Sequence, residues 1–219
     1  MCGENRNSAK PCYWVNGILT NIAATAQYAW TYGICVSNGD VYVVGGDGSS
    51  DPCYWKNGVK NSLTRVYNNT TGSGTYQEAE TRAIFVKGTD VYVAGRKRYP
   101  GSWRACYWKN NTPFDFTTDG TKDAWANGIA VHNGKVYAAG YDEVDRGACY
   151  WENECKITLE GSYGHAYDIA VAGNNVYVVG DYVNINWKNV ACIWINGVRI
   201  DLTDGTNSAE ALAIALSWE

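Results

Sequence analysis

Polar and aromatic side chains precede a recurring isoleucine at five places in the chain. Indole and phenol rings stack on sugar rings, and carboxylate and amide groups hydrogen-bond to sugar hydroxyls. Four residues before the isoleucine stand Trp30, Glu80, Trp125, His165 and Glu210, and two residues before it stand Tyr32, Arg82, Asn127, Tyr167 and Leu212. These residue types predict a rim that binds carbohydrate.

Trp30 and Trp125 also have a structural interpretation, in which they cover the ends of interfaces between neighbouring sheets. Trp103 and Trp187 fall outside the repeated pattern, in segments that read as loops. A tryptophan in a loop has less reason to be core, so both are additional binding candidates.

Catalytic and metal-binding patterns have little support. His165 and Asp168 are three residues apart but have no nucleophile at a recognisable spacing, and the chain has no G-x-S-x-G sequence. Glu80 and Glu210 could form a carboxylate pair only if the fold brought them together. The chain also lacks C-x-x-C and D-x-D-x-D-G segments. We therefore expect no catalytic residue, no metal and no cofactor, and a protein that is not an enzyme.

Acidic residues follow the second strand of each predicted unit. They are Glu4, Asp47, Asp142 and Asp181, and Arg96 interrupts the series. A carboxylate at such a position caps loop amides or pairs with a neighbouring Arg or Lys. We favour this role over ligand binding.

The elements that would position these residues are set by one repeated sequence, typified by Cys-Tyr-Trp-Lys-Asn-Gly. Its copies begin at Cys12, Cys53, Cys106, Cys149 and Cys192, 41 to 53 residues apart. The last four copies each follow a Val-Tyr run that ends in glycine, whereas the first follows only a remnant of that run at residues 1–4. Each copy ends near a tight Asn-Gly or similar turn. No helical periodicity occurs in the chain.

Each repeat predicts four antiparallel strands joined as a meander, which is the sheet of a β-propeller blade. We expect an all-β, five-bladed β-propeller whose ring is closed when a C-terminal strand, Ala211 to Ser217, joins the N-terminal blade. This single domain, 1–219, would have blades at 211–219 plus 1–22, 30–64, 80–117, 125–160 and 165–203.

The meander places the connections on two opposite edges of each sheet. One edge carries only tight turns such as Asn38-Gly39 and Asn57-Gly58. The other edge carries the rim residues and connections that differ in every repeat, at 67–77, 96–104, 142–147 and 181–189. Because loops on a rigid scaffold can diverge, we expect binding on the variable edge.

The eight cysteines read mainly as core residues. Five share one repeat position, and equivalent positions in stacked sheets lie about 10 Å apart, beyond the ~7 Å Cα limit for a disulfide. A link between Cys2 and Cys12 within one sheet is an alternative. The repeated tryptophans at 14, 55, 108, 151 and 194 are also expected in the core.

Charge and hydropathy limit the partners. A net charge of -4 and a pI near 5.2 argue against nucleic-acid binding, which depends on clustered Lys and Arg. No apolar run approaches the ~20 residues of a membrane span, and no signal-peptide pattern opens the chain. We expect a soluble monomer.

The repeats resemble bacterial propeller proteins built from YWKNG, LTDGT, AxxIxV and VYVAG units. The matching residues here are 54–58, 202–206, 126–131 and 91–95. The resemblance covers almost the whole chain and implies a secreted or lipid-anchored protein, whereas unpaired cysteines would also fit the cytoplasm. Tachylectin-type sugar-binding propellers are similar only in blade number.

The sequence therefore favours a non-enzymatic binding or scaffold module that recognises a carbohydrate or surface polymer on its variable edge. A protein-interaction platform is the alternative, and a glycan hydrolase or lyase is a third interpretation.

Overall fold

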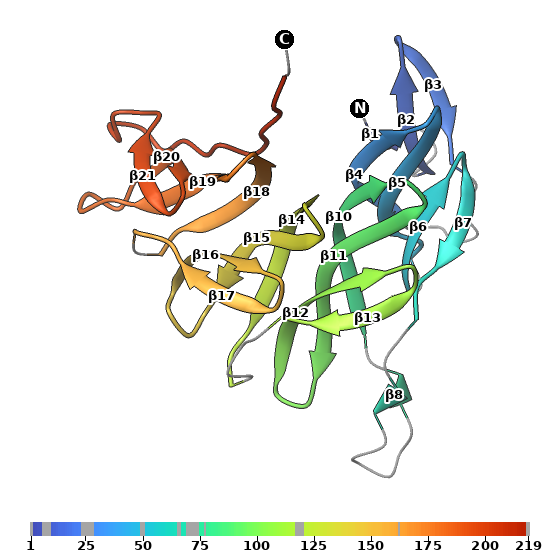
Figure 1. The fold of residues 1–219 in the computed structure, drawn as a ribbon, viewed down its shortest axis with the longest axis horizontal. Coiled ribbons are helices and arrows are strands. Elements are labelled where there is room, and N and C mark those ends of the chain that lie inside the picture. The colour runs from blue at the N-terminus through green and yellow to red at the C-terminus, as the bar shows by residue number, and fades with distance from the viewer. Residues whose placement is uncertain are drawn as a thin grey trace. The chain divides into compact units, whose positions relative to one another are not determined.

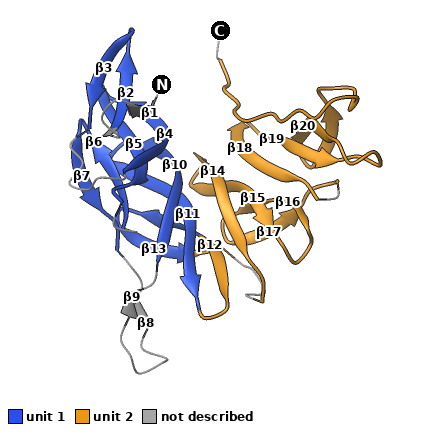
Figure 2. Cartoon of the chain, turned by 180° about the vertical axis from the view of Figure 1, so that it is seen from behind, with its two compact units in different colours: residues 1–99, 106–114 blue, residues 100–105, 115–219 orange. Residues whose placement is uncertain are grey.

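The chain folds entirely into β-strands and connections in the part that the structure describes. The computed structural model describes residues 2–5, 10–22, 29–48, 51–64, 67–68, 75–76, 78–116, 121–161 and 163–217. Two compact units are present (Figure 2). Unit 1 is residues 1–99 with 106–114, and unit 2 is residues 100–105 with 115–219.

The sheets of unit 1 follow the repeats in order (Figure 1). The first has three strands, β1 (Cys2–Asn5), β2 (Lys10–Val15) and β3 (Ile18–Asn21). The second has β4 (Trp30–Ser37), β5 (Asp40–Gly46), β6 (Pro52–Lys56) and β7 (Val59–Ser62). The third has β10 (Ala79–Lys87), β11 (Asp90–Tyr99), β12 (Ser102–Lys109) and β13 (Thr112–Asp115), with the start of β12 assigned to unit 2. Between the second and third sheets, β8 (Tyr67–Asn68) pairs with β9 (Thr75–Tyr76).

Unit 2 contains two further four-stranded sheets. The first has β14 (Ala124–His132), β15 (Lys135–Asp142), β16 (Gly147–Glu152) and β17 (Cys155–Thr158). The second has β18 (His165–Ala172), β19 (Asn175–Val183), β20 (Asn189–Ile195) and β21 (Val198–Asp201). Neighbouring strands are consecutive in sequence, so the predicted antiparallel meander is confirmed for these sheets.

The repeated Cys and Trp side chains form the core, as predicted. The cysteines that start the repeats are buried, and no disulfide joins the seven cysteines that the structure describes. Trp55, Trp108, Trp151 and Trp194 are at most 1% exposed. Trp14 is only half-buried, in the three-stranded first sheet. The proposed link to Cys12 is not formed, and the side chain of Cys2 lies outside the described residues.

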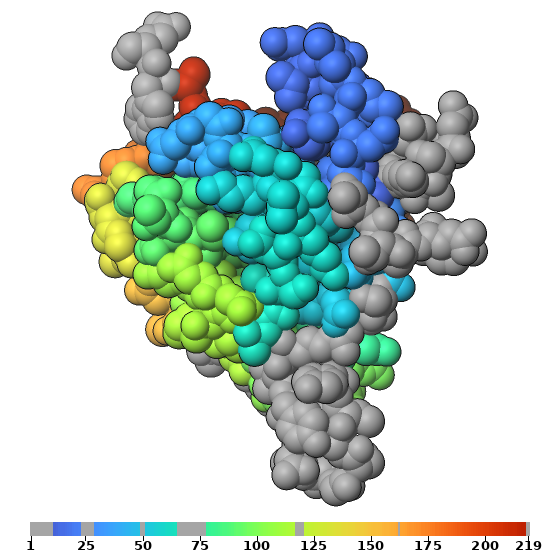
Figure 3. All heavy atoms as spheres, turned by 90° about the vertical axis from the view of Figure 1, so that its right-hand side faces the viewer, coloured from blue at the N-terminus to red at the C-terminus, as the bar shows by residue number. Residues whose placement is uncertain are grey.

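Neighbouring sheets within a unit are tied by the indoles of this motif. Trp108 Nε1 donates to the carbonyl of Thr64 in unit 1, and Trp194 Nε1 donates to the carbonyl of Glu160 in unit 2, both at 2.9 Å. Each acceptor lies just after the outer strand of the preceding sheet. Figure 3 shows the second sheet of unit 1 (light blue to cyan) between the first sheet (dark blue) and the third (green).

The tight-turn edge is built by the asparagine of the same motif. Asn57 has a left-handed backbone with φ 49°, which asparagine tolerates better than most residues. Its side chain accepts from Val41 N at 2.8 Å and donates to Asp40 at 2.7 Å, which joins the β6–β7 turn to the β4–β5 turn. Asn110 makes the same contacts with Val91 and Asp90.

A β-bulge interrupts the first strand of each four-stranded sheet. The register of β18 with β19 pairs Ala166 with Gly180 and Asp168 with Val179, so Tyr167 is an extra residue. Tyr32, Arg82 and Asn127 are the extra residues of the other bulges. A bulge re-aims the side chain that it inserts. The second position of the predicted rim is therefore the bulge position.

The strand expected over 211–217 is not formed. No strand follows β21 among the described residues up to 217. A strand requires a hydrogen-bonded neighbour, and this segment is held instead by separate contacts with unit 2. Ala211 N donates to Gly180 O at 3.3 Å, and Ile214 N donates to the Asp168 carboxylate at 3.0 Å.

Candidate functional site

The first rim position lies opposite a variable residue of the second strand. The ladder pairs Trp30 with Gly46, Glu80 with Arg96, Trp125 with Tyr141 and His165 with Asp181. Directly paired residues lie side by side on one face of the sheet. The chemistry at each place therefore depends on both members of the pair.

In unit 1 the rim residues form an ion-pair cluster. The Glu80 carboxylate accepts hydrogen bonds from Arg96 Nε at 3.1 Å and Arg96 Nη2 at 3.0 Å. It also accepts one from Arg82 Nη2 at 3.2 Å. The Arg82 guanidinium lies 4.3 Å from the ring centroid of Tyr32, which is 46% exposed. These contacts hold Glu80 between two cations, which suits a structural role.

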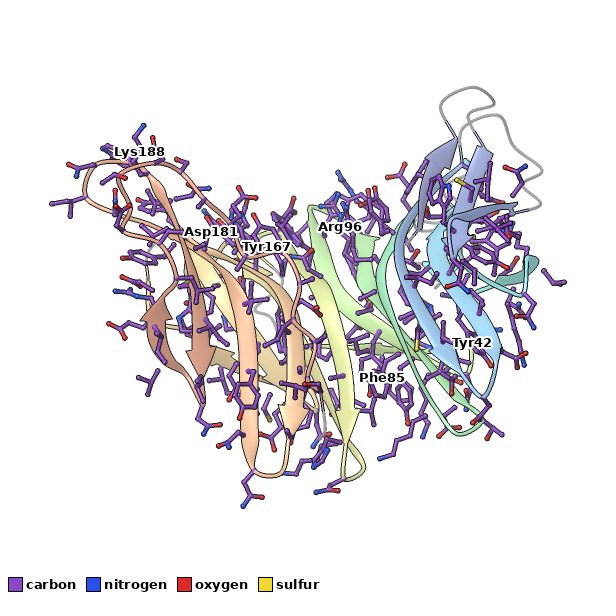
Figure 4. The ribbon with its side chains drawn as sticks, turned by 90° about the horizontal axis from the view of Figure 1, so that it is seen from above. Tyr42, Phe85, Arg96, Tyr167, Asp181 and Lys188 are labelled. Atoms are coloured by element: carbon purple, nitrogen blue, oxygen red, sulfur yellow. The ribbon has the colours of Figure 1, made fainter. Side chains whose placement is uncertain are left out.

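Trp30 is held by the backbone opposite it. A Cβ on Gly46 would lie 2.6 Å from Trp30 Cζ2, so the indole lies directly over this glycine. The indole is half-buried. Figure 4 shows Arg96 toward one edge of unit 1 and Tyr42 and Phe85 toward the other.

In unit 2 four rings form a bent row along the variable edge, and the ring centroids of Trp125 and His165 are 6.5 Å apart across the bend. The ring centroids of Trp125 and Tyr141 are 4.8 Å apart, and those of Tyr141 and His165 are also 4.8 Å apart. His165 and Tyr167 continue the row at 6.0 Å, with an interplanar angle of 23°. We call these four residues the aromatic row. Three of them were predicted as rim residues, and Tyr141 was missed.

Two carboxylates, those of Asp181 and Glu210, lie next to Tyr167 in the aromatic row. Asp181 is fully buried, and its Oδ1 lies 3.6 Å from His165 Nδ1 and accepts from His165 N at 3.2 Å. Burial, together with the carboxylates of Asp181 and Glu210, raises the pKa of Tyr167. The Tyr167 hydroxyl is protonated at neutral pH, and its proton faces these two carboxylates. Figure 4 shows Tyr167 and Asp181 close together in unit 2.

The acids that follow the second strand are of two kinds. Asp47 pairs with Lys60, and Asp142 pairs with Lys156 at 2.8 Å and accepts from Val144 N at 2.9 Å, as predicted. The prediction that groups Asp181 with these two acids was wrong. Asp181 directly follows the glycine of its Val-Tyr run, whereas Asp47 and Asp142 stand two residues after theirs.

The residue that aligns with Asp47 and Asp142 in the last sheet is Tyr182. The Arg199 guanidinium lies 3.8 Å from its ring centroid and also pairs with Asp201 at 3.0 Å. Arg199 takes the strand position of Lys60 and Lys156. Among the described residues, the buried Asp181 Oδ2 has no hydrogen-bond partner. The side chain of Glu4 lies outside the described residues.

His165 and Asp168 do not form the pair considered from their spacing. His165 faces Asp181, whereas Asp168 accepts from the backbone N–H groups of Ile169 at 2.9 Å and Ile214 at 3.0 Å. Burial raises the pKa of Asp168, and these two hydrogen bonds oppose that shift. Asp168 therefore anchors the C-terminal segment.

The remaining predicted residues have different environments. Asn127 donates to the carbonyl of Ala166 at 3.0 Å, which ties β14 to β18. Trp103 is half-buried, and its N–H donates to Asp123 at 2.8 Å. Glu210 is exposed and accepts from Asn189 Nδ2 at 3.2 Å. Leu212 is 64% exposed and Trp187 is 77% exposed.

An open hollow of about 260 Å³ adjoins the aromatic row. It is lined by Lys122, Tyr141, Glu143, Arg146 and Tyr163. Arg146 Nη1 donates to the Tyr163 hydroxyl at 3.3 Å, and the ring centroids of Tyr163 and Trp187 are 6.2 Å apart. We call the five lining residues the charged hollow. Sequence reasoning missed all of them, although Tyr141 could have been found as the ladder partner of Trp125.

The described ranges hold neither a metal-binding group of side chains nor a membrane-spanning helix. No group of three or more His, Cys, Asp or Glu side chains there could hold a metal ion. No helix there is long and apolar enough to cross a bilayer.

Comparisons with known proteins identify no family. No protein-family model and no curated protein matches the chain. Among solved structures, the chain is similar to the computationally designed Ika8 protein, with a TM-score of 0.49 and 16% identity over 95% of this chain and 59% of that chain. It is also similar to the computationally designed Ika4 protein, with a TM-score of 0.42 and 12% identity over 79% of this chain and 95% of that chain. The chain thus spans about three fifths of the length of the first. The architecture common to its sheets remains that of antiparallel four-stranded meanders.

Proposed function

We propose that the chain is a non-enzymatic module that recognises carbohydrate on the variable edge of unit 2. The observation that supports this function is the aromatic row of Trp125, Tyr141, His165 and Tyr167. Aromatic rings supply apolar surface for a sugar ring, and the Tyr167 hydroxyl oxygen can accept a hydrogen bond from a sugar hydroxyl beside it. The exposed Trp187 and Tyr163 extend the aromatic surface.

A scaffold for this edge is a five-bladed β-propeller, which we also propose. Its support is that the first sheet has three strands where each later repeat has four. The pairing of Gly3 with Cys12 corresponds to that of Gly45 with Cys53, which aligns β1 with β5. In our proposal the segment 211–217 supplies the missing inner strand and closes the ring.

Carbohydrate recognition is tested by a glycan array followed by calorimetric titration of each glycan that is retained. Trp125→Ala and Trp187→Ala are expected to weaken binding at least ~10-fold, since alanine removes most of the ring surface in contact with the sugar. Phe114→Ala is the matched control, because Phe114 is 37% exposed on the outer strand β13. Retention of no glycan by the wild-type protein would refute the proposal.

A protein-interaction platform is the second candidate. It is favoured by Ile185 and Trp187, which are 95% and 77% exposed within one connection. Exposed apolar side chains of this size occur at protein contacts. A purified partner whose affinity falls in Ile185→Ser and Trp187→Ala, with no glycan retained, would favour this function over the first.

A further inference from the structure

Three residues with strained backbones meet beside the charged hollow. Among the described residues other than glycine, a positive φ occurs at eight asparagines and at Arg146, Tyr163 and Trp187, with φ of 51°, 54° and 57°. Large side chains rarely adopt this conformation, and such strain concentrates at functional sites. Arg146 contacts Tyr163, and Tyr163 contacts Trp187, so the three form one continuous surface.

The charges of the hollow are not neutralised by its neighbours. Nearby Asp142 and Asp145 are both engaged by Lys156, each at 2.8 Å. Among the described residues, neither Lys122 nor Arg146 makes an ion pair. With Glu143 as its single acid, the lining carries two positive charges and one negative charge. A ligand with one negative charge would complement this lining.

We infer that the charged hollow binds a uronic acid residue of an acidic glycan, with its carboxylate on Arg146 and Lys122 and its ring against Tyr141 and Tyr163. This inference rests on the proposed carbohydrate recognition and names its ligand class. The guanidinium uses one N–H toward Tyr163, and its remaining donors fit a planar carboxylate. Glu143 can accept from a sugar hydroxyl.

The size and charge of the hollow discriminate against other anions. Its volume of about 260 Å³ lies below the ~300–1,000 Å³ of pockets for drug-sized ligands, so it suits one sugar ring of a chain. Glu143 would repel a doubly charged phosphate more than a singly charged carboxylate. An uncharged sugar would leave both cations without a partner.

The test compares trigalacturonate, its carboxyl-reduced counterpart and a trisaccharide phosphate monoester by calorimetry on the full chain. The wild-type protein is expected to bind trigalacturonate at least ~10-fold more tightly than the other two. The reduced sugar lacks the charge that strengthens its hydrogen bonds to the two cations, and Glu143 repels the doubly charged phosphate. Arg146→Asn should abolish this preference. Asparagine is chosen because it occupies the left-handed region at eight other positions and removes only the guanidinium. Lys87→Gln removes one exposed positive charge in unit 1 and should change nothing.

The outcomes separate this inference from the function on which it rests. Equal binding of trigalacturonate and its reduced counterpart, or equal binding of the phosphorylated sugar, would overturn the uronic acid assignment and leave carbohydrate recognition standing. An array that retains only neutral glycans has the same meaning. Retention of no glycan at all would overturn both. A preference that persists in Arg146→Asn would also overturn the assignment.

Discussion

At the scale of single residues, one ion pair recurs at equivalent positions in three repeats, and its two charges are swapped in one of them. Lys56 pairs with Asp40 at 2.7 Å, and Lys109 pairs with Asp90 at 3.2 Å. The next repeat reverses the charges, since Lys135 pairs with Glu152 in the equivalent strand positions. The pairs join the start of the second strand to the end of the third. Reversal of both charges together indicates that the contact is retained for its complementarity.

The thiols of the repeats show how strongly the core is shielded from water. Burial raises the pKa of Cys53 and Cys192 to about 12 from an ordinary value of 9.0. Burial also raises the pKa of Cys149. These thiols are therefore neutral in the folded state at any physiological pH, which agrees with a packing role.

Stability should consequently fall as the pH rises above 9. Between pH 9 and about 12 an unfolded chain releases the protons of Cys53 and Cys192, whereas the folded chain keeps them. Proton release then favours unfolding, by up to ~1.4 kcal/mol per pH unit for each thiol. Urea unfolding at pH 8, 9 and 10 measures this slope.

Ionising tyrosines add to the same slope, so a variant is needed to assign it. Cys53→Ala with Cys192→Ala should reduce the dependence on pH while keeping the fold, because alanine is small and apolar. An unchanged slope in this double variant would show that the thiols are not responsible.

At the scale of elements, the bulge explains the glycine that follows each Val-Tyr run within the second strand. A Cβ on Gly180 would lie 1.9 Å from the carbonyl oxygen of His165, and one on Gly140 would lie 2.0 Å from that of Trp125. The bulge brings the inner strand against the second strand, and only glycine leaves room. The same crowding places the rim residues, so the motif positions the candidate site.

Gly180→Ala is expected to destabilise the chain by at least ~3 kcal/mol, because the new methyl group meets backbone that cannot rotate away. Gly134→Ala is the matched control. Gly134 has nothing within 4 Å of its Cβ position and a φ of 78°, so only conformational strain of about 1–2 kcal/mol applies. Equilibrium unfolding in urea compares the two, and equal losses would argue against backbone crowding.

Much of the strand arrangement could be predicted because the same strand and turn signals recur in five repeats. Val-Tyr alternation, the Cys-Tyr-Trp motif and Asn-Gly turns are local signals, and the order of β4 to β7 follows from them. The bulges could not be predicted, because an extra residue leaves the alternation of its neighbours ambiguous. The charged hollow was missed for a similar reason. Arg146 and Tyr163 lie in connections, and only their backbone conformations bring them together.

At the scale of the whole molecule, the first sheet and the C-terminal segment are complementary in sequence. The alignment of Gly3 with Gly45 places Cys2 at the position of Val44, which pairs with Gly33. Ala213 stands at the Gly33 position of its repeat, one residue before the recurring isoleucine. In the proposed closed ring, Ala213 would therefore pair with Cys2.

Ala213→Cys tests this pairing. Directly paired Cα atoms in antiparallel strands are about 4.5–5.5 Å apart, within the range that a disulfide bridges. Mild oxidation is expected to join the introduced thiol to Cys2 within one chain, as read by peptide mapping under non-reducing conditions. Ile214→Cys is the control, since the neighbouring residue of a strand points to the opposite face. Bond formation only between different chains, or equally in both variants, would contradict ring closure.

The inserted bulge residue has a consequence for how such a protein could be altered. Tyr32 and Tyr167 have no ladder partner opposite them, so exchanging either breaks no cross-strand pair. The glycine of the second strand that faces the bulge, by contrast, has no room for a side chain. The side chain at these two bulge positions could therefore be varied while the sheet that carries it stays the same. A library randomised at these two positions would sample new specificities from a framework that still folds.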